Sequence, residues 1–242
     1  MQYVVKNVLI FGASGHGSVI LDCLERSTEY APVGFVDSFK EKGTKINGYE
    51  VLGSEFDLPF LMEQFQIEGG IVAVGDNWGR HQFVSRILAI YPRFRFITVV
   101  HPSAIIGKGV TLGKGTVVLP GAIINANTRV GDHCILNTKS SLDHDCKMGD
   151  YSSLAPGAFT GGNVSIGEGT AICLGAKLIE CITIGEYAVI GANSLVLKNV
   201  SNNTVVYGSP AQTVRQRKPW DPYLRQQRKP NPFQLRLDYT GT

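Results

Sequence analysis

The sequence predicts an α/β N-terminal domain with a small, Rossmann-like parallel sheet, followed by a left-handed parallel β-helix of hexapeptide repeats. Two observations carry this prediction. A glycine-rich loop, GASGHG at 12–17, follows the first apolar run, and an aliphatic residue recurs at every sixth position from Ile106 to Val196. We therefore divide the 242 residues into an N-terminal domain (1–100), a β-helix (101–215) and a basic C-terminal tail (216–242).

The first domain begins with a strand, the glycine loop and a helix. Residues 3–11 (YVVKNVLIF) are apolar and β-rich, and residues 18–27 have apolar side chains at helical spacing (Val19, Ile20 and Leu24). Such a loop lets backbone N–H groups and a helix N-terminus approach a phosphate, which indicates an anion or nucleotide site. Its spacing, G-x-x-G-x-G, differs from the G-x-G-x-x-G of dinucleotide enzymes, and a tight turn without a ligand is the alternative interpretation.

Two further strands and a helix complete this domain. Residues 32–37 (PVGFVD) end in Asp37, where a carboxylate could accept a hydrogen bond from a ribose or a base, and residues 69–77 (GGIVAVGDN) form the third strand. Residues 79–91 are predicted to form an amphipathic helix with four inward side chains (Phe83, Ile87, Leu88 and Tyr91). Alternating strands and helices favour a parallel sheet with its ligand at the carboxyl ends of the strands, and the short domain favours a mononucleotide-sized site.

The second half of the chain is an uninterrupted six-residue repeat. Of the sixteen positions from Ile106 to Val196, fifteen are aliphatic or Met. The residue directly after each of these positions is often Gly, and the residue four places after each of them is small or β-branched. This period fits a triangular coil of three hexads, in which the aliphatic residue points inward, the small residue fits under the corner and Gly takes the turn. A β-sandwich is disfavoured because it would not hold one period over so long a segment.

Composition excludes several classes of protein. The tail from residue 215 carries seven Lys or Arg against two Asp, so the body is slightly acidic and a nucleic-acid-binding body is not expected. No apolar run approaches the length of a membrane span, and the N-terminus lacks the features of a secretory signal, so a cytoplasmic location is predicted. Five cysteines without a CxxC pair predict reduced, buried thiols and no zinc site.

The histidines separate into ordinary ones and two candidates. We expect His81 on the polar side of its helix, His101 at the domain junction and His133 at a solvent-facing hexad position. His16 stands inside the glycine loop, where packing has little use for an imidazole. His144 is the strongest candidate, because it is the outward third residue of its hexad and lies between Asp143 and Asp145; an adjacent carboxylate fixes the tautomer and raises the basicity of an imidazole. An ordinary surface histidine is the alternative.

Together these segments resemble the NeuD/PglD-type sugar O- and N-acetyltransferases. The resemblance covers residues 3–215 and rests on the glycine loop, the second strand that ends in Asp, HPSA before the repeats, LNTKSSLDHDCKMGDYSSLAPGAFTGG, and VVYGSPAQTVR at the end. It implies a homotrimer whose N-terminal domain holds a nucleotide-linked sugar and whose acetyl-CoA lies between neighbouring β-helices.

The resemblance also implies roles for individual residues. His144 matches the catalytic base and Asp145 the carboxylate that tunes it. The substrate-binding positions are matched by Ser14, Gly15, His16, Asp37, Ser38 and Gly75. The acetyl-CoA positions are matched by Ser153, Gly162, Leu174 and Ala192, of which Ser153 stands where a His can occur and Ala192 where Gly is found. No metal is implied.

The predicted reaction is N-acetylation of a nucleotide-linked amino sugar, for surface polysaccharide or glycan biosynthesis. No Ser-His-Asp or Cys-His arrangement for an acyl-enzyme is evident, so direct attack on the thioester with His144 as general base is expected. The alternative is O-acetylation of a sugar or a sialic acid. A zinc-dependent carbonic anhydrase, which needs three histidines from adjacent coils, a nicotinamide oxidoreductase and a non-catalytic nucleotide-sugar-binding protein are less favoured. The sugar, the nucleotide and the acetylated position stay open.

Overall fold

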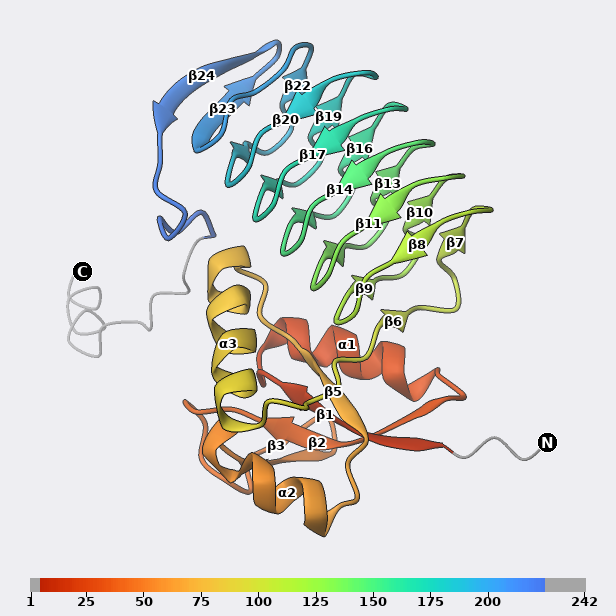
Figure 1. Cartoon of the computed structure of the whole chain (residues 1–242), viewed down its shortest axis with the longest axis vertical. Coiled ribbons are helices and arrows are strands. Elements are labelled where there is room, and N and C mark those ends of the chain that lie inside the picture. Colours follow the sequence, from red (N-terminus) through yellow and green to blue (C-terminus); the bar gives the residue numbers. More distant parts are fainter. Residues whose placement is uncertain (1–4, 225–242) are drawn as a thin grey trace, which may run out of the picture.

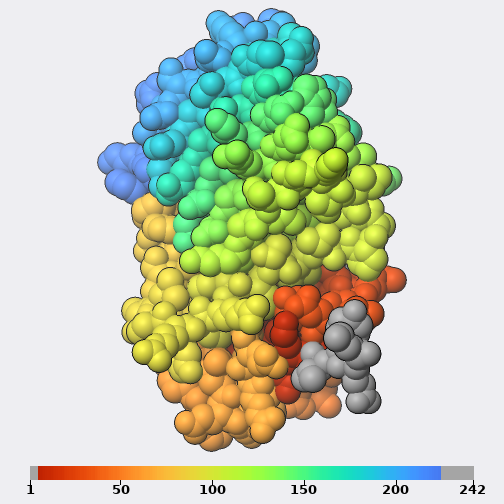
Figure 2. Space-filling model, turned by 45° about the vertical axis from the view of Figure 1, so that its right-hand side comes forward, coloured from red at the N-terminus to blue at the C-terminus, as the bar shows by residue number. Residues whose placement is uncertain are grey.

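The structure is a computed structural model that describes residues 5–224. An α/β part forms the base of the molecule, and a prism of short strands rises from it (Figure 1). In the space-filling view the two parts form one continuous body (Figure 2). The predicted order, a small α/β sheet and then a parallel β-helix, is confirmed.

The N-terminal sheet has five strands in the order β3-β4-β2-β1-β5. Their bounds are β1 (Lys6–Phe11), β2 (Tyr30–Val36), β3 (Lys45–Ile46), β4 (Tyr49–Gly53) and β5 (Gly69–Val72). The strand pairs β1–β2, β1–β5 and β2–β4 are parallel, and β3 pairs antiparallel with β4. The carboxyl ends of β1, β2 and β5 therefore meet at one edge, which is the edge where such sheets bind ligands.

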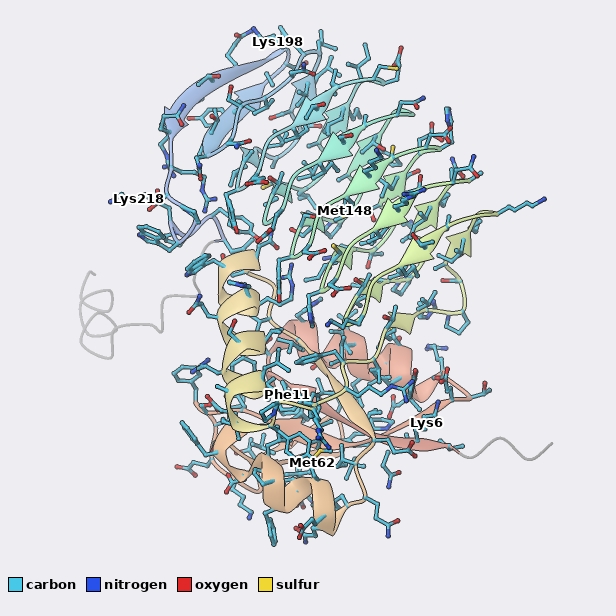
Figure 3. All side chains as sticks on the ribbon, in the orientation of Figure 1. Lys6, Phe11, Met62, Met148, Lys198 and Lys218 are labelled. Atoms are coloured by element: carbon cyan, nitrogen blue, oxygen red, sulfur yellow. The ribbon has the colours of Figure 1, made fainter. Side chains whose placement is uncertain are left out.

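Helices cover both faces of this sheet. Their bounds are α1 (Gly15–Glu25), the 3₁₀ turn η1 (Glu55–Asp57), α2 (Leu58–Gln64) and α3 (Asn77–Ile90). Phe11 is fully buried and lies in the core beside α3 (Figure 3). Leu88, predicted to face inward, is exposed, and Val84 is buried instead. In α1, Val19, one of the apolar residues at helical spacing, is exposed, whereas Leu21 is buried. In α1 the reason is that the helix packs against the β-helix as well as against the sheet, which changes the face that is buried.

The prism consists of sixteen two-residue strands, β7 to β22, between two flanking elements. The strands are β7 (Ile105–Ile106), β8 (Thr111–Leu112), β9 (Val117–Val118), β10 (Ile123–Ile124), β11 (Arg129–Val130), β12 (Ile135–Leu136), β13 (Ser141–Leu142), β14 (Lys147–Met148), β15 (Ser153–Leu154), β16 (Phe159–Thr160), β17 (Ser165–Ile166), β18 (Ala171–Ile172), β19 (Lys177–Leu178), β20 (Thr183–Ile184), β21 (Val189–Ile190) and β22 (Leu195–Val196). Strand β6 (Val99–Val100) precedes them, and the hairpin β23 (Thr204–Gly208) and β24 (Ala211–Gln216) closes the far end.

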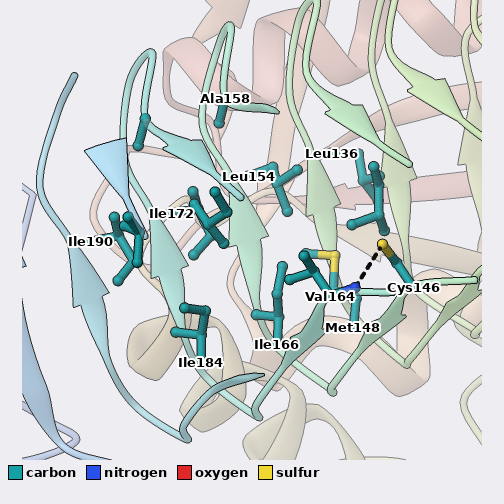
Figure 4. Close-up of a cluster of buried hydrophobic side chains, with 14 of the residues drawn as sticks. Leu136, Cys146, Met148, Leu154, Ala158, Val164, Ile166, Ile172, Ile184 and Ile190 are labelled. Carbon is teal, nitrogen blue, oxygen red and sulfur yellow. Dashed lines mark hydrogen bonds between the residues drawn. The ribbon is translucent and has the colours of Figure 1, made fainter. Parts of the chain in front are cut away.

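The strands form three parallel sheets, one on each side of the prism. Each strand pairs with the strands eighteen residues before and after it, so that Leu142 lies on Ile124 and Ile124 on Ile106. The inward residues form a continuous buried stack (Figure 4). Ile106, in the first coil, is 40% exposed because no complete coil lies below it. The hexad prediction of inward positions is otherwise confirmed, including Thr160, which is 8% exposed.

The role predicted for the hexad glycines needs a correction. The residues with positive φ are the third after each inward residue, among them Asn127 with φ 62° and Asp145 with φ 57°. Glycines such as Gly107 directly follow the inward residue, and they are needed because adjacent coils come close: a Cβ at Gly107 would lie 2.7 Å from the backbone nitrogen of Ala126. These glycines serve coil stacking, and the left-handed turn belongs to another position.

The cysteines are all free thiols, as expected, but they are not all buried. Three are buried, Cys173 is partly buried, and Cys181 is exposed. Cys181 occupies a hexad position with positive φ, 60°, from which the side chain projects away from the stack. The prediction of a buried thiol is wrong at this position.

The prediction of a solvent-facing His133 is also wrong, since only 2% of this residue is exposed. Its ring stacks on Tyr151 at 5.1 Å between centroids and meets the edge of Phe96 at 4.7 Å. Burial lowers its pKa to about 4, so the ring is neutral. The hexad places His133 outward from the prism, but the N-terminal part covers that corner, and a local repeat carries no information about such a neighbour.

Candidate functional site

His144 and Asp145 form a hydrogen-bonded pair on the outer surface of the prism, in the turn between β13 and β14. The Nδ1 atom of His144 lies 2.8 Å from the Oδ2 atom of Asp145, and both side chains are about half exposed. The hydrogen bond to Asp145, aided by the charges of Asp143 and Asp145, raises the pKa of His144. Because Nδ1 is engaged, Nε2 is the ring nitrogen left to accept a proton from a substrate.

Asparagines of the preceding coil hold the neighbouring carboxylates. Asn127 donates its side-chain N–H to Asp145 at 3.2 Å, and Asn125 donates to Asp143 at 2.6 Å. Asp143 also accepts from the backbone N–H of His144 at 2.8 Å. The hydrogen bond from His144 and then that from Asn127 lower the pKa of Asp145, which keeps it ionised beside the imidazole. Each partner lies eighteen residues earlier, so the register of the coils positions this network.

Gly162 lies one coil beyond His144 and leaves room for its ring. A Cβ at Gly162 would lie 2.5 Å from both Cε1 and Nε2 of His144. The backbone N–H of Asn163 donates to the carbonyl of His144 at 2.9 Å, which fixes the two coils together. Within residues 5–224 the N–H of Gly162 makes no hydrogen bond, so a backbone donor lies near the proton-accepting nitrogen.

A cavity of about 570 Å³ lies at a different corner of the prism, between the β-helix and the N-terminal part. It is bordered by five residues that the sequence predicts to bind one ligand or the other, namely His16, Gly75, Ser153, Leu174 and Ala192. His144 and Asp145 do not line it. Residues assigned to the substrate and residues assigned to acetyl-CoA thus meet in one cavity, while the candidate base lies elsewhere on the same chain.

His16 is the polar side chain of greatest interest in this cavity. It belongs to the first turn of α1, and its Nε2 atom is buried with no hydrogen-bond partner among residues 5–224. Burial, together with the nearby positive charge of Arg80, lowers its pKa to about 4. Ser14 is the N-cap of α1 and Gly15 its first residue, and the Ser14 side chain makes no capping hydrogen bond. A neutral imidazole and a helix N-terminus are therefore available to bind an anionic or polar ligand.

A second cavity, of about 230 Å³, lies at the carboxyl ends of the sheet strands and is lined by Asp37 and Ser38. The carboxylate of Asp37 accepts from the backbone N–H groups of Ala13 and Phe39, each at 2.8 Å, so it also fixes the glycine loop. Ser38 hydrogen-bonds to the buried Glu55, whose other carboxylate oxygen lies 3.1 Å from Arg86.

The structure thus brings the predicted residues together in three groups rather than one. Sequence reasoning missed Asn125 and Asn127, which an eighteen-residue offset from the two aspartates could have shown. It also missed Phe39 and Arg86, which line the second cavity, and no sequence signal marked them.

Residues 5–224 contain neither a metal-binding cluster nor a membrane-spanning helix. No three His, Cys, Asp or Glu side chains in that range are grouped so as to hold a metal ion. In the same range, no helix combines the length and the apolar character needed to cross a membrane.

Comparison with known proteins places this geometry in a class. The model of the PglD N-terminal domain matches residues 7–87. A UDP-N-acetylbacillosamine N-acetyltransferase of Bacillus subtilis (strain 168) is 36% identical over 115 residues, which are 47% of this chain and 51% of that protein. The chain therefore matches only about half the length of this curated relative.

Solved structures match nearly the whole chain. PerB from Caulobacter crescentus, in complex with CoA and GDP-perosamine, has 31% identity and a TM-score of 0.81, over 89% of this chain and 100% of that one. The acetyltransferase domain of PglB from Neisseria gonorrhoeae FA1090, in complex with acetyl coenzyme A, has 29% identity and a TM-score of 0.80, over 87% and 100%.

The fold and the site define a hexapeptide-repeat acyltransferase whose left-handed β-helix follows a small α/β domain. Within that class, the chain belongs to the NeuD/PglD-type family of sugar acetyltransferases.

Proposed function

We propose that this protein is an acetyl-CoA-dependent N-acetyltransferase that acts on the amino group of a nucleotide-linked amino sugar. The observation that carries the proposal is the His144–Asp145 pair, an imidazole held through Nδ1 beside a backbone N–H. The relatives support the choice of substrates, because PerB forms a complex with CoA and GDP-perosamine and the Bacillus subtilis relative is a UDP-N-acetylbacillosamine N-acetyltransferase. These relatives favour N-acetylation over O-acetylation.

The proposed mechanism is direct transfer. Nε2 of His144 takes a proton from the sugar amine as its nitrogen attacks the thioester carbonyl of acetyl-CoA. The N–H of Gly162 donates to the oxygen on which negative charge develops, as an oxyanion hole does. Collapse then forms the amide and expels the coenzyme A thiolate, which takes the proton from the imidazolium of His144 and so regenerates the base. Asp145 stabilises the imidazolium in between.

The remaining site residues have binding roles in this proposal. Substrate contacts fall to the N-terminal part, at the start of α1 (Ser14, Gly15 and His16) and at the strand ends (Asp37, Ser38 and Gly75). Acetyl-CoA contacts fall to the β-helix (Ser153, Gly162, Leu174 and Ala192). The 570 Å³ cavity fits such ligands: its lining is predominantly apolar, as suits a pantetheine arm, and the imidazole nitrogen Nε2 of His16, which has no partner among residues 5–224, is available to a polar group.

A homotrimer is part of the proposal, because the candidate base and the 570 Å³ cavity lie at different corners of one prism. A second copy that brings its His144 to the cavity of the first would complete the site, and three copies would give three such sites. We also place the enzyme in the cytoplasm, in a pathway for surface polysaccharide or glycan, since acetyl-CoA and activated sugars are available there.

The test of the function is release of the coenzyme A thiol from acetyl-CoA, measured with a panel of UDP-, dTDP- and GDP-linked amino sugars. One member of the panel is expected to give turnover, with mass spectrometry showing an N-acetyl group on the product. Turnover only with hydroxyl sugars would replace the N-acetyl proposal by the O-acetyl one. Light scattering on the same sample tests the trimer, since a mass near 26.3 kDa would mean a monomer.

The pH dependence of the reaction should depend on Asp145. His144 acts as a base only when neutral, so kcat falls as the pH drops through its pKa, which Asp145 raises. Asp145→Asn removes that carboxylate, so the acid limb of the kcat profile should move to lower pH while the plateau rate falls. Asp143→Asn is the comparison variant and should move the limb less, since Asp143 acts on the imidazole through its charge and not through a side-chain hydrogen bond. An unmoved limb in Asp145→Asn would contradict the coupling.

The substrate and acetyl-CoA should respond differently to a change in the sheet. Asp37→Ala removes the acceptor that holds the backbone of Ala13 and Phe39, so KM for the nucleotide sugar is expected to rise about tenfold, the effect of losing hydrogen bonds to a charged group. KM for acetyl-CoA should stay within twofold. Asp22→Ala, on the exposed face of α1, serves as the control. Equal increases in both KM values would mean that the two ligands are not divided between the two parts.

A further inference from the structure

The first residues of the basic tail, Arg217 to Leu224, form an ordered segment that we call the strap. It leaves the end of β24 and runs down to the start of α3 (Figure 1), and Lys218 is labelled on it in Figure 3. The prolines and aromatic residues of the tail (216–242) predict an extended segment over the surface of a trimer. Residues 225–242 lie outside the described residues, and the described part crosses the junction between the two parts of its own chain.

A buried arginine fixes the upper half of the strap to the prism. Arg217 is 7% exposed, and its guanidinium donates to the carbonyl oxygens of Tyr187 at 2.6 Å, of Pro219 at 3.1 Å and of Asp221. The carboxylate of Asp221 accepts from the backbone N–H of Lys218 at 3.0 Å. The segment is therefore folded around its own arginine as well as bound to the β-helix.

Aromatic contacts join the strap to α3. The ring of Trp220 lies 6.0 Å from that of Trp78, in the first turn of α3, and Trp78 lies 6.5 Å from Tyr187 of the prism.

Tyr223 connects the two parts of the chain at the cavity itself. Its ring packs on a small apolar cluster of the prism that includes Ala171 and Val189. Its hydroxyl accepts from the backbone N–H of Asn77 at 3.2 Å and donates to the carbonyl of Gly75 at 3.3 Å. Burial raises the pKa of this phenol to about 12, so the hydroxyl keeps its proton for that second bond.

Leu224 continues from Tyr223 along the rim of the 570 Å³ cavity. It lines the cavity together with His16, Leu174 and Ala192, and it is 48% exposed. A Cβ at Gly75 would lie 3.7 Å from its Cδ1 atom, in ordinary van der Waals contact. The side chain of Leu224 thus lies opposite the predicted substrate and acetyl-CoA positions, and Gly75 has no side chain that would separate Leu224 from them.

We propose that the strap is a wall of the nucleotide-sugar site, in which Tyr223 positions the Gly75 loop against the β-helix and Leu224 closes the rim of the cavity. This inference rests on the proposed function. Tyr223 is a positioning residue, since its hydroxyl bonds to the backbone at Asn77 and Gly75, and it acts on the substrate through Gly75. The strap therefore contributes to affinity for the nucleotide sugar and leaves the chemical step to His144.

The hydroxyl of Tyr223 is tested with Tyr223→Phe, which keeps the ring and removes both hydrogen bonds. KM for the amino sugar that is turned over in the panel assay should rise about 3- to 10-fold, the effect of one or two neutral hydrogen bonds. Both kcat and KM for acetyl-CoA should stay within twofold, which a general loss of stability would not produce. Tyr30→Phe, in β2 and away from the cavity, is the control. An unchanged KM for the sugar in Tyr223→Phe would overturn the positioning role.

The strap as a whole is tested with two truncations of the full-length enzyme. A chain that ends at Leu224 should have the sugar KM of the complete protein, whereas one that ends at Gln216 should have a sugar KM at least tenfold higher. If both truncations have the same KM, the strap is not a wall of the site. Melting temperatures of both are recorded, because loss of the buried Arg217 also removes contacts to the prism.

A direct readout of the strap comes from the chain's two tryptophans, Trp78 and Trp220, which lie on either side of the contact. Their emission should shift to the red when Leu224→Asp is introduced at the rim, and the sugar KM should rise with it. Emission that shifts without a change in KM would separate the strap from the site. If wild-type enzyme releases no thiol with any sugar of the panel, the proposed function fails instead.

Discussion

Replacing His144 with alanine is expected to lower kcat by about 10²- to 10⁴-fold, the usual contribution of a general base. The imidazole is half exposed, and its hydrogen-bond partner Asp145 lies on the same turn, so removal should not disturb the stacked side chains of Leu142 and Met148. Binding of acetyl-CoA should persist, because the base is needed only for the chemical step. Steady-state kinetics with the amino sugar, together with calorimetric binding of acetyl-CoA, would measure both.

A matched control for this variant is His101→Ala, which removes an imidazole that hydrogen-bonds to Ser103 near the start of the β-helix. Its kcat should stay within twofold of the wild-type value. If His144→Ala kept more than half of the wild-type kcat while its oligomeric state was unchanged, the assignment of the base and most of the mechanism would have to be abandoned.

Arg80→Met is expected to lower the free energy of unfolding by about 3 to 5 kcal/mol, because it leaves several buried acceptors without a donor. Arg80 is 1% exposed and has six acceptors, three of them carbonyls of the β-helix (His133, Tyr151 and Ser152) and three in the N-terminal part (Val74, Gly75 and the side chain of Asn77). This side chain joins the two parts of the molecule. Urea unfolding followed by circular dichroism would measure the loss.

Arg86→Met is the control, because it makes the same substitution on the same helix at an arginine that is not buried. The side chain of Arg86 is 53% exposed, and its ion pair with Glu55 should contribute less. Its urea midpoint should therefore stay closer to that of the wild type. Similar midpoints for both variants would show that the hydrogen bonds of Arg80 add little to stability.

The architecture was predictable because the repeat is strictly local. A residue such as Leu142 has its neighbours at eighteen-residue offsets, so a pattern along the chain specifies contacts in space. The faces of α1 and α3 were less predictable: Leu88 was assigned to the wrong side, and Val19, one of the apolar residues at helical spacing in α1, is exposed. A helix of about ten residues contains few periods, and contacts with a second neighbour change which face is buried.

The candidate site shows the same division. His144 and Asp145 are adjacent in sequence, so their hydrogen bond follows from local geometry. The hydrogen bond of Arg80 to the carbonyl of His133 and that of Tyr223 to the carbonyl of Gly75 join residues that are more than 50 positions apart in the chain. Such contacts depend on how the two parts dock, and neither repeat nor motif encodes that docking in a form that can be read from one sequence.

The uninterrupted stacking of coils also gives the prism a constant repeat distance along its axis. Adjacent strands are separated by about 4.8 Å, so equivalent positions in successive coils differ in height by multiples of that distance. His144 and Gly162 are one such step apart. Loss or gain of eighteen residues would move the reacting groups by a whole step relative to the α/β part and keep every inward contact, while any shorter change would rotate the turn that carries the base to another side. A change in the number of coils could therefore accommodate acceptor substrates of different length without a change in the turn that carries His144.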